Sequence, residues 1–221
     1  MNIKINIQKI TQNLPPGCQL VAVSKTKSAS LIQEAYDAGQ RHFGENKVQE
    51  LVPKFEALPK DICWHMIGHL QSNKVKYIVP FVHLIHSIDS DRLLAEVNKQ
   101  AAKYNRTVSC LLQVHIAREE TKFGFSLDEV KSFIHSGHIE SLQNIRIAGL
   151  MGMATLTDNE DQVSDEFKSL RLTFEELRSG SLPPNASMDV LSMGMSGDYS
   201  LAVAEGSTMI WVGSAIFGDR A

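Results

Sequence analysis

A single α/β domain built as a closed (β/α)8 barrel is the fold class that the sequence predicts. Short apolar runs rich in β-branched residues recur along the 221 residues, and segments with helical spacing lie between them. The recurrence gives about 28 residues per strand–helix repeat, which suits a compact TIM barrel. No Pro/Gly/Ser-rich linker divides the chain, so one domain is expected over residues 1–221. An open doubly wound sheet is the alternative, but no G-x-G-x-x-G motif follows the first apolar run.

Strands are expected where the apolar runs lie. The first run contains Leu20, Val21, Ala22 and Val23 in succession, as is typical of a strand covered on both faces. Strands that alternate with helices form parallel sheets, because each helical crossover returns the chain to the same edge. In chain order the expected strands are residues 19–24, 41–45, 63–70, 84–89, 108–116, 146–153, 189–195 and 208–216.

Helices are expected between these strands from their apolar spacing and their capping residues. Ser30 and Gln33 form a capping-box pattern, and Ser126 and Glu129 form another one before an apolar face. The longest helical segment is amphipathic and ends at Gly180, a residue that is common just past helix ends. The expected helices lie around residues 31–36, 91–104, 126–134 and 160–180.

Composition and charge narrow the class of protein. The formal net charge is −3 without a long basic block, which argues against a non-specific nucleic-acid binder. The N-terminal residues lack the apolar segment of a signal peptide, and no apolar run approaches the roughly 20 residues of a membrane span. Cys18, Cys63 and Cys110 form no CxxC pair, so we expect reduced thiols, with Cys63 and Cys110 in the core. The sequence therefore predicts a cytoplasmic protein without a nucleic-acid or membrane partner.

Polar residues that follow the expected strands indicate where chemistry takes place, because active sites in this fold lie at the carboxyl ends of the strands. Lys25 follows the first strand among small hydroxylated residues, where partial desolvation would lower its pKa and leave free amine to attack a carbonyl. Small residues gather in 192–198 and 212–218, where backbone N–H groups can hold a phosphate. A lysine with a phosphate site fits a Schiff-base aldolase of phosphosugars or a protein that binds pyridoxal 5′-phosphate (PLP). A solvated lysine that caps the strand is the third interpretation.

His65 and His69 are the histidine pair that most resembles a metal site by spacing. The stretch reads HMIGH rather than HExxH and is expected to be a strand. On a strand this spacing places both side chains on one face but about 13 Å apart, so zinc binding by this pair is not expected.

Seven motifs follow one another in a fixed order along the chain: AVSKTK (22–27), FGEN (43–46), WHMIGHLQSNK (64–74), HSIDS (86–90), GLMGMA (149–154), LSMGMSGDY (191–199) and GSTMIWVGSAIFG (206–218). HLQxNK and SMGMSxDY together are a specific combination, whereas SKT alone is a weak signal. In this order the motifs resemble the YggS/PROSC family of PLP homeostasis proteins. The resemblance covers residues 19–218.

The resemblance implies a fold-type III PLP-binding barrel, similar to the N-terminal domain of alanine racemase but without its second, β-rich domain. It implies that Lys25 forms the internal aldimine with PLP. The other matching positions are Ser192, Gly194, Gly213 and Ser214 in the phosphate-binding turns, and Asn46, His69 and Ser87 at polar positions around the cofactor.

Trp211 departs from the family pattern. Relatives usually read VRIG near the last strand, whereas this chain reads IWVG at 210–213, so Trp211 replaces an expected arginine. In the related racemases an arginine near this position donates a hydrogen bond to the pyridine nitrogen. An indole N–H also donates one bond but carries no charge. Trp211 is therefore expected either to contact the cofactor or to pack between the barrel and a helix.

The functional hypothesis from the sequence is a PLP carrier or regulator in vitamin B6 and amino-acid homeostasis, without catalytic turnover. Its partners would be PLP and either apo-PLP enzymes or a regulatory protein, and a monomer is expected because the dimerising domain is missing. No metal is expected. A PLP-dependent racemase or lyase is the alternative, although no second general base opposite Lys25 is evident from the sequence.

Overall fold

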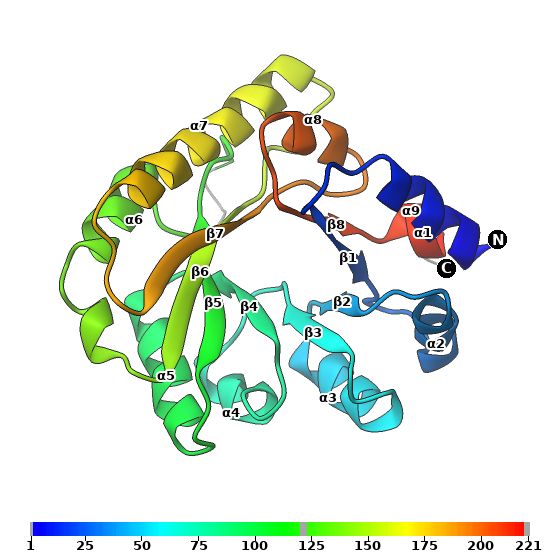
Figure 1. Ribbon diagram of the computed structural model, residues 1–221, viewed down its shortest axis with the longest axis horizontal. Coiled ribbons are helices and arrows are strands. Elements are labelled where there is room, and N and C mark those ends of the chain that lie inside the picture. Colours follow the sequence, from blue (N-terminus) through cyan, green and yellow to red (C-terminus); the bar gives the residue numbers. More distant parts are fainter. Residues whose placement is uncertain (1, 120–122, 219–221) are drawn as a thin grey trace.

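The computed structural model describes residues 2–119 and 123–218 and shows a closed parallel barrel surrounded by helices (Figure 1). Each strand pairs with its neighbour in the chain, and β8 pairs with β1 to close the sheet. The strands are β1 (Gln19–Val23), β2 (His42–Glu45), β3 (Cys63–Met66), β4 (Leu84–Ile88), β5 (Val108–Val114), β6 (Ile145–Gly152), β7 (Ala186–Ser192) and β8 (Met209–Val212). The predicted (β/α)8 barrel is confirmed, and the doubly wound alternative is wrong.

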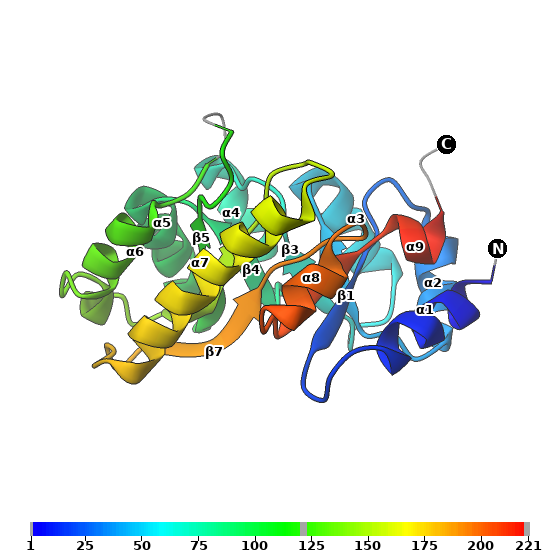
Figure 2. The ribbon, with the colours of Figure 1, turned by 90° about the horizontal axis from the view of Figure 1, so that it is seen from above.

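The helices lie outside the barrel, and α1 precedes the first strand (Figure 2). The described helices are α1 (Ile3–Gln12), α2 (Ala29–Asp37), α3 (Val48–Ala57), α4 (Val75–Ile78), α5 (Asp91–Ala102), α6 (Leu127–Ile134), α7 (Glu160–Ser179), α8 (Tyr199–Ala204) and α9 (Ser214–Phe217), with 3-10 turns at Ser72–Lys74 and Ile139–Ser141. Helices α1 and α9 lie side by side (Figure 1). None of these described helices is both long and apolar enough to cross a membrane.

Several predicted bounds differ from the structure. The strand expected over 63–70 ends at Met66. The prediction was too long because the apolar run continues into the following loop, where Ile67 and Leu70 are buried. The strand expected over 208–216 ends at Val212, and its last apolar residues instead form the buried side of α9. The seventh strand covers 186–192 rather than 189–195.

Helix starts show one confirmed and one wrong prediction. The capping box of Ser126 and Glu129 is present at the start of α6. Helix α2 instead begins after Ser28, whose Oγ accepts a hydrogen bond from the Leu31 N–H, so Ser30 lies inside the helix. Ser28 has the extended backbone that an N-cap requires, which explains why it takes the capping role.

Two apolar layers hold the barrel together. The inner layer joins side chains from strands on different sides of the barrel, such as Val21, Leu84 and Leu111, which can only meet in its interior. The outer layer packs Phe43 and Trp64 between the strands and the surrounding helices. Because successive side chains of a strand point to opposite faces, one strand contributes to both layers.

The cysteines are free thiols. Cys110 is fully buried, as predicted. Cys63 is only half-buried at the start of β3, so its prediction as a core residue is wrong.

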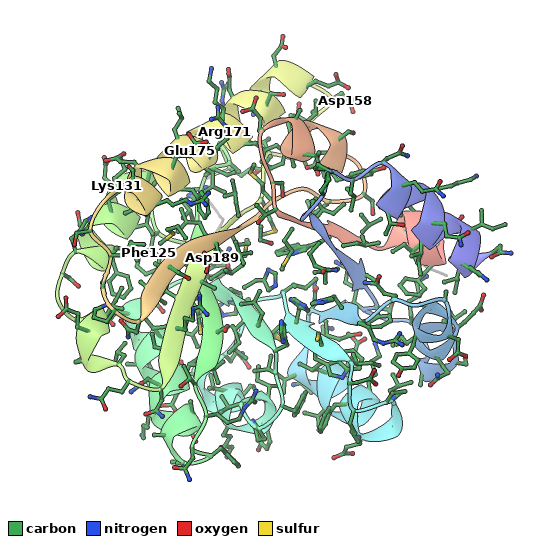
Figure 3. The ribbon with its side chains drawn as sticks, viewed as in Figure 1. Phe125, Lys131, Asp158, Arg171, Glu175 and Asp189 are labelled. Atoms are coloured by element: carbon green, nitrogen blue, oxygen red, sulfur yellow. The ribbon has the colours of Figure 1, made fainter. Side chains whose placement is uncertain are left out.

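The outer face of α7 is charged. Arg171 and Glu175 lie one turn apart on this helix (Figure 3), and their side chains form an ion pair of 3.1 Å. Lys131 of α6 pairs with Glu176 of α7 at 2.5 Å. Exposed pairs of this kind contribute only about 0.2–1 kcal/mol each, so apolar packing dominates the stability of the helical layer.

Replacing Gly149 with alanine should strongly destabilise the barrel. The register of β6 and β7 shifts at this residue, which has φ +154°, and an added Cβ would lie 1.8 Å from the Val190 carbonyl oxygen. We expect Gly149→Ala to lower the free energy of unfolding by at least about 2 kcal/mol in urea denaturation. Gly137→Ala is the control, because Gly137 has φ +75° but open space around it and should lose only about 1 kcal/mol. Equal losses in the two variants would contradict this account.

Candidate functional site

A cavity of about 710 Å³ opens where the strands end at their carboxyl termini. Its walls come from both ends of the chain, since residues after β1 and after β8 line it together. Six predicted site residues line this cavity: Lys25, Asn46, His69, Trp211, Gly213 and Ser214. Its size is within the range of about 300–1,000 Å³ that is usual for cofactor and ligand sites.

The other three predicted site residues, Ser87, Ser192 and Gly194, do not line the cavity. Ser87 donates its hydroxyl hydrogen bond to the Gly68 carbonyl at 2.6 Å, which fixes a residue of the cavity wall. Ser192 is fully buried, and its Oγ lies 3.1 Å from His86 Nδ1. Gly194 has φ +98° and lies tightly against α8, because a Cβ there would be 2.6 Å from the Ala202 Cβ.

The sequence motifs also contained cavity residues that were not singled out. Ser196 and Gly197 line the cavity and belong to the same SMGMSGD turn as Ser192 and Gly194, so the signal for them was present. Gln113 and Phe123 line it from the β5 side, where no motif marked them.

The residue before Lys25 is held by a buried ion pair. Ser24 donates its hydroxyl hydrogen bond to Glu45 Oε1 at 2.6 Å. Lys54 Nζ donates to the same carboxylate oxygen at 2.6 Å and to the Ser24 carbonyl at 2.9 Å. Glu45 is fully buried, and this burial raises its pKa even though Lys54 and Ser24 act in the opposite direction. The end of β1 is therefore anchored to β2 and α3.

The residue after Lys25 is held in an unusual backbone conformation. Thr26 has φ +64°, which is rare for a β-branched residue and requires support from the surroundings. Its N–H donates a hydrogen bond to Glu50 Oε2 at 2.7 Å. Burial raises the pKa of Glu50, but the bonds from Thr26 and Lys54 outweigh it, so the net pKa is lowered. Lys25 thus lies between two fixed residues, which limits where its side chain can go.

The turns after β7 and β8 form a wall of small residues. The Gly213 N–H donates a hydrogen bond to Ser196 Oγ at 3.1 Å, which joins the two turns. Lys27 connects this wall to the β1 side, because its Nζ donates to the carbonyls of Phe217 at 3.3 Å and Gly218 at 3.0 Å. These contacts join the turns after β1, β7 and β8 into one wall of the cavity.

Trp211 forms part of the cavity wall from within the barrel. It is 6% exposed, and its ring meets the His86 ring edge-on at a centroid distance of 5.3 Å. Its Nε1 is shielded from solvent and has no hydrogen-bond partner among the described residues. Trp211 therefore presents ring surface to the cavity rather than an accessible N–H.

Three histidines form a hydrogen-bonded chain through the barrel interior. His42 Nδ1 lies 2.9 Å from His65 Nε2, and His65 Nδ1 lies 2.8 Å from His86 Nε2. His86 Nδ1 lies 3.1 Å from Ser192 Oγ, which ends the chain. Burial lowers the pKa of His42 to about 4 and that of His86 to about 3, and it lowers the pKa of His65 well below its usual range. The three histidine side chains are therefore neutral at pH 7.

His69 lies at the rim of the cavity and is not part of the histidine chain. Because β3 ends at Met66, His65 and His69 do not share one strand face, contrary to the sequence expectation. His69 Nδ1 lies 3.1 Å from Asp89 Oδ2, and the His69 ring stacks on Phe123 at 4.6 Å. His69 thus lines the same cavity as Lys25.

A parallel barrel with a lysine after its first strand and small-residue turns after its last two strands defines a protein of the alanine racemase barrel class. The family model "Alanine racemase, N-terminal domain" matches residues 1–221. The chain therefore belongs to this family and, by full-length relatives as well as its motifs, to the YggS/PROSC group of PLP homeostasis proteins.

Two comparisons support the narrower group. A Synechocystis protein named pyridoxal phosphate homeostasis protein is 40% identical over 218 residues, with 96% of each chain covered. The structure of PipY from Synechococcus elongatus PCC7942 with PLP bound has a TM-score of 0.87 at 38% identity, covering 98% of this chain and 100% of PipY.

Alanine racemase from E. faecalis shares the fold. Its TM-score is 0.73 at 17% identity, and the match covers 99% of this chain but 58% of the racemase.

Acid should destabilise the fold through the buried histidines. His86 has an ordinary pKa of 6.5 when unfolded, whereas burial lowers it to about 3 in the folded chain. The unfolded state therefore takes up the proton first, and the stability is lost as the pH falls below about 6.5. Between pH 7 and pH 5 this one residue should account for a loss of about 2 kcal/mol.

The pH dependence of urea unfolding measures this effect. His86→Gln should reduce the loss between the two pH values by about 2 kcal/mol, whatever its stability at pH 7. His135→Gln, at an exposed residue, should keep the full loss. An unchanged pH dependence in His86→Gln would contradict the assignment.

Proposed function

We propose that this protein binds PLP and acts in PLP homeostasis, with Lys25 holding the cofactor as a Schiff base. The observation that carries the proposal is that Lys25 and the small-residue turns at Ser196–Gly197 and Gly213–Ser214 line one cavity. The names of the full-length relatives and the PLP-bound structure of PipY support PLP binding and a role in PLP homeostasis.

The residues of the cavity fit this cofactor. An added Cβ at Gly197 would meet nothing within 4 Å, so the backbone of this turn is uncovered, as a phosphate site built from backbone N–H groups requires. When bound, PLP supplies an aldehyde that condenses with an amine and an electron-withdrawing ring. Lys25 would supply the amine, Gly197, Gly213 and Ser214 would hold the phosphate, and the Trp211 ring would pack against the cofactor.

Asn46 and His69 are the remaining polar groups of the proposed binding site, and both line the cavity. We assign Ser87, Ser192 and Gly194 to the support of its walls, because each is engaged just behind them. The protein would act in the cytoplasm as a monomer and would hold and release PLP for apo-enzymes or a regulatory protein.

A PLP-dependent amino-acid racemase or lyase is the second candidate function. It is favoured by one observation: His69, paired with Asp89 at 3.1 Å, lines the same cavity as Lys25. Such a pair would be able to accept a proton from a substrate carbon. It would therefore serve as the second base that racemisation needs beside Lys25.

Borohydride reduction of the PLP-loaded protein should attach the phosphopyridoxyl group to Lys25. Absorption spectra would follow PLP binding, and peptide mass mapping would locate the adduct. Lys25→Met should lose the adduct, whereas Lys47→Met, at an exposed lysine, should keep it. An adduct that persists in Lys25→Met would contradict the assigned anchor.

The loaded protein also distinguishes the two candidate functions. A carrier should leave the α-proton of added amino acids unexchanged in deuterated water. Exchange that depends on both Lys25 and His69 would establish the catalytic alternative instead.

Trp211 should act through its ring surface and not through its N–H. We expect Trp211→Phe to bind PLP within about threefold of the original chain, because the lost donor is shielded from the cavity. A lost hydrogen bond of about 1.4 kcal/mol would weaken binding tenfold. Absorbance titrations would compare it with Trp64→Phe, which removes another buried N–H that has no partner among the described residues and lies away from the cavity. Tenfold weaker binding in Trp211→Phe alone would show that its N–H contacts the cofactor.

A further inference from the structure

Three potential metal ligands meet at the end of the barrel opposite the cavity. His42 is the first residue of β2, Cys63 is the first residue of β3, and His83 directly precedes β4. One ligand atom from each residue lies within 4.8 Å of the other two. The proposed PLP site uses none of them, since the cavity lies at the other ends of these strands.

The fold fixes the positions of these three residues. His42 is paired with Cys63 in the parallel register of β2 and β3, so their side chains point to the same side of the sheet. The His83 N–H donates a hydrogen bond to the Trp64 carbonyl at 2.8 Å, which attaches its backbone to β3. The rings of His42 and His83 meet edge-on at a centroid distance of 5.5 Å.

The histidine chain orients His42 as a ligand. Its Nδ1 is engaged with His65 at 2.9 Å, which leaves Nε2 as the ring nitrogen for a metal. Metal-binding histidines usually have their second nitrogen held in this way, because the outer partner fixes both the tautomer and the ring orientation.

We propose that His42, Cys63 and His83 bind a divalent zinc ion. One thiolate and two imidazoles are a ligand set that suits zinc. Zinc also tolerates an irregular arrangement of ligands, because its filled d shell imposes no preferred coordination geometry. Bonds of about 2.1 Å to nitrogen and 2.3 Å to sulfur place tetrahedral ligands about 3.5 Å apart. Zinc binding would draw together ligand atoms that lie within 4.8 Å of one another, and a water molecule would complete the fourth position.

Zinc at this position would also set the direction of the histidine chain. A metal on His42 Nε2 requires that Nδ1 carries the hydrogen, so His42 donates to His65. His65 then donates to His86, and His86 donates to Ser192. Without the metal, the reverse direction of all three hydrogen bonds is equally consistent with neutral rings.

Zinc binding to the reduced, PLP-free chain tests the proposal by titration calorimetry against a competing chelator. We expect one zinc ion per chain. Cys63→Ser and His83→Ala should each weaken binding by more than the roughly 10–100-fold that is typical for loss of an outer partner, and His65→Gln should fall within that range. Cys18→Ser and His135→Ala, which change the same residue types elsewhere, should bind as the original chain does.

Cobalt provides a second readout that does not depend on affinity alone. Co²⁺ at this site should give a thiolate-to-cobalt charge-transfer band that disappears in Cys63→Ser and persists in Cys18→Ser. The fold of each variant is checked by urea unfolding, and His83→Ala changes an exposed side chain outside the strands. Absence of stoichiometric zinc, or equal weakening in the control variants, would overturn the proposal.

Discussion

The main-chain hydrogen bonds between β1 and β8 close the barrel and set the geometry of the cavity. They pair Val21 with Trp211, two residues that are 190 positions apart in the chain. The pairing brings Lys25, which follows β1, and the turn at Gly213, which follows β8, to the same cavity. Closure of the sheet also removes exposed strand edges, so the barrel can present its open ends to solvent without offering a strand for association.

The interior of the barrel combines an apolar layer with a polar chain that carries no charge. Each neutral imidazole has one donor and one acceptor nitrogen, so His42, His65 and His86 satisfy one another in sequence. Ser192 can both donate and accept, and it therefore suits the inner end of the chain in either direction. A charged group in the same place would need a buried partner, because unpaired charges are very costly to remove from water.

The barrel, the position of Lys25 and the small-residue turns could be predicted because local patterns encode them. Apolar runs mark the strands, and the residues just beyond each run mark its end. The end of β3 was predicted too late because Ile67 and Leu70, which belong to the following loop, are buried and continue the apolar signal. The histidine chain could not be read from spacing, since its last hydrogen bond joins His86 to Ser192 across 106 positions.

The contact of Lys27 with the carbonyls of Phe217 and Gly218 bears on the order in which the protein matures during synthesis. The ribosome makes the lysine turn early, but the backbone groups that hold it are made only after all eight strands. Until then the turn at Thr26 has one of its supports, from Glu50, and lacks the other. In a nascent chain the turn that contains Lys25 would therefore lack these carbonyl contacts until the last residues of the barrel have been made.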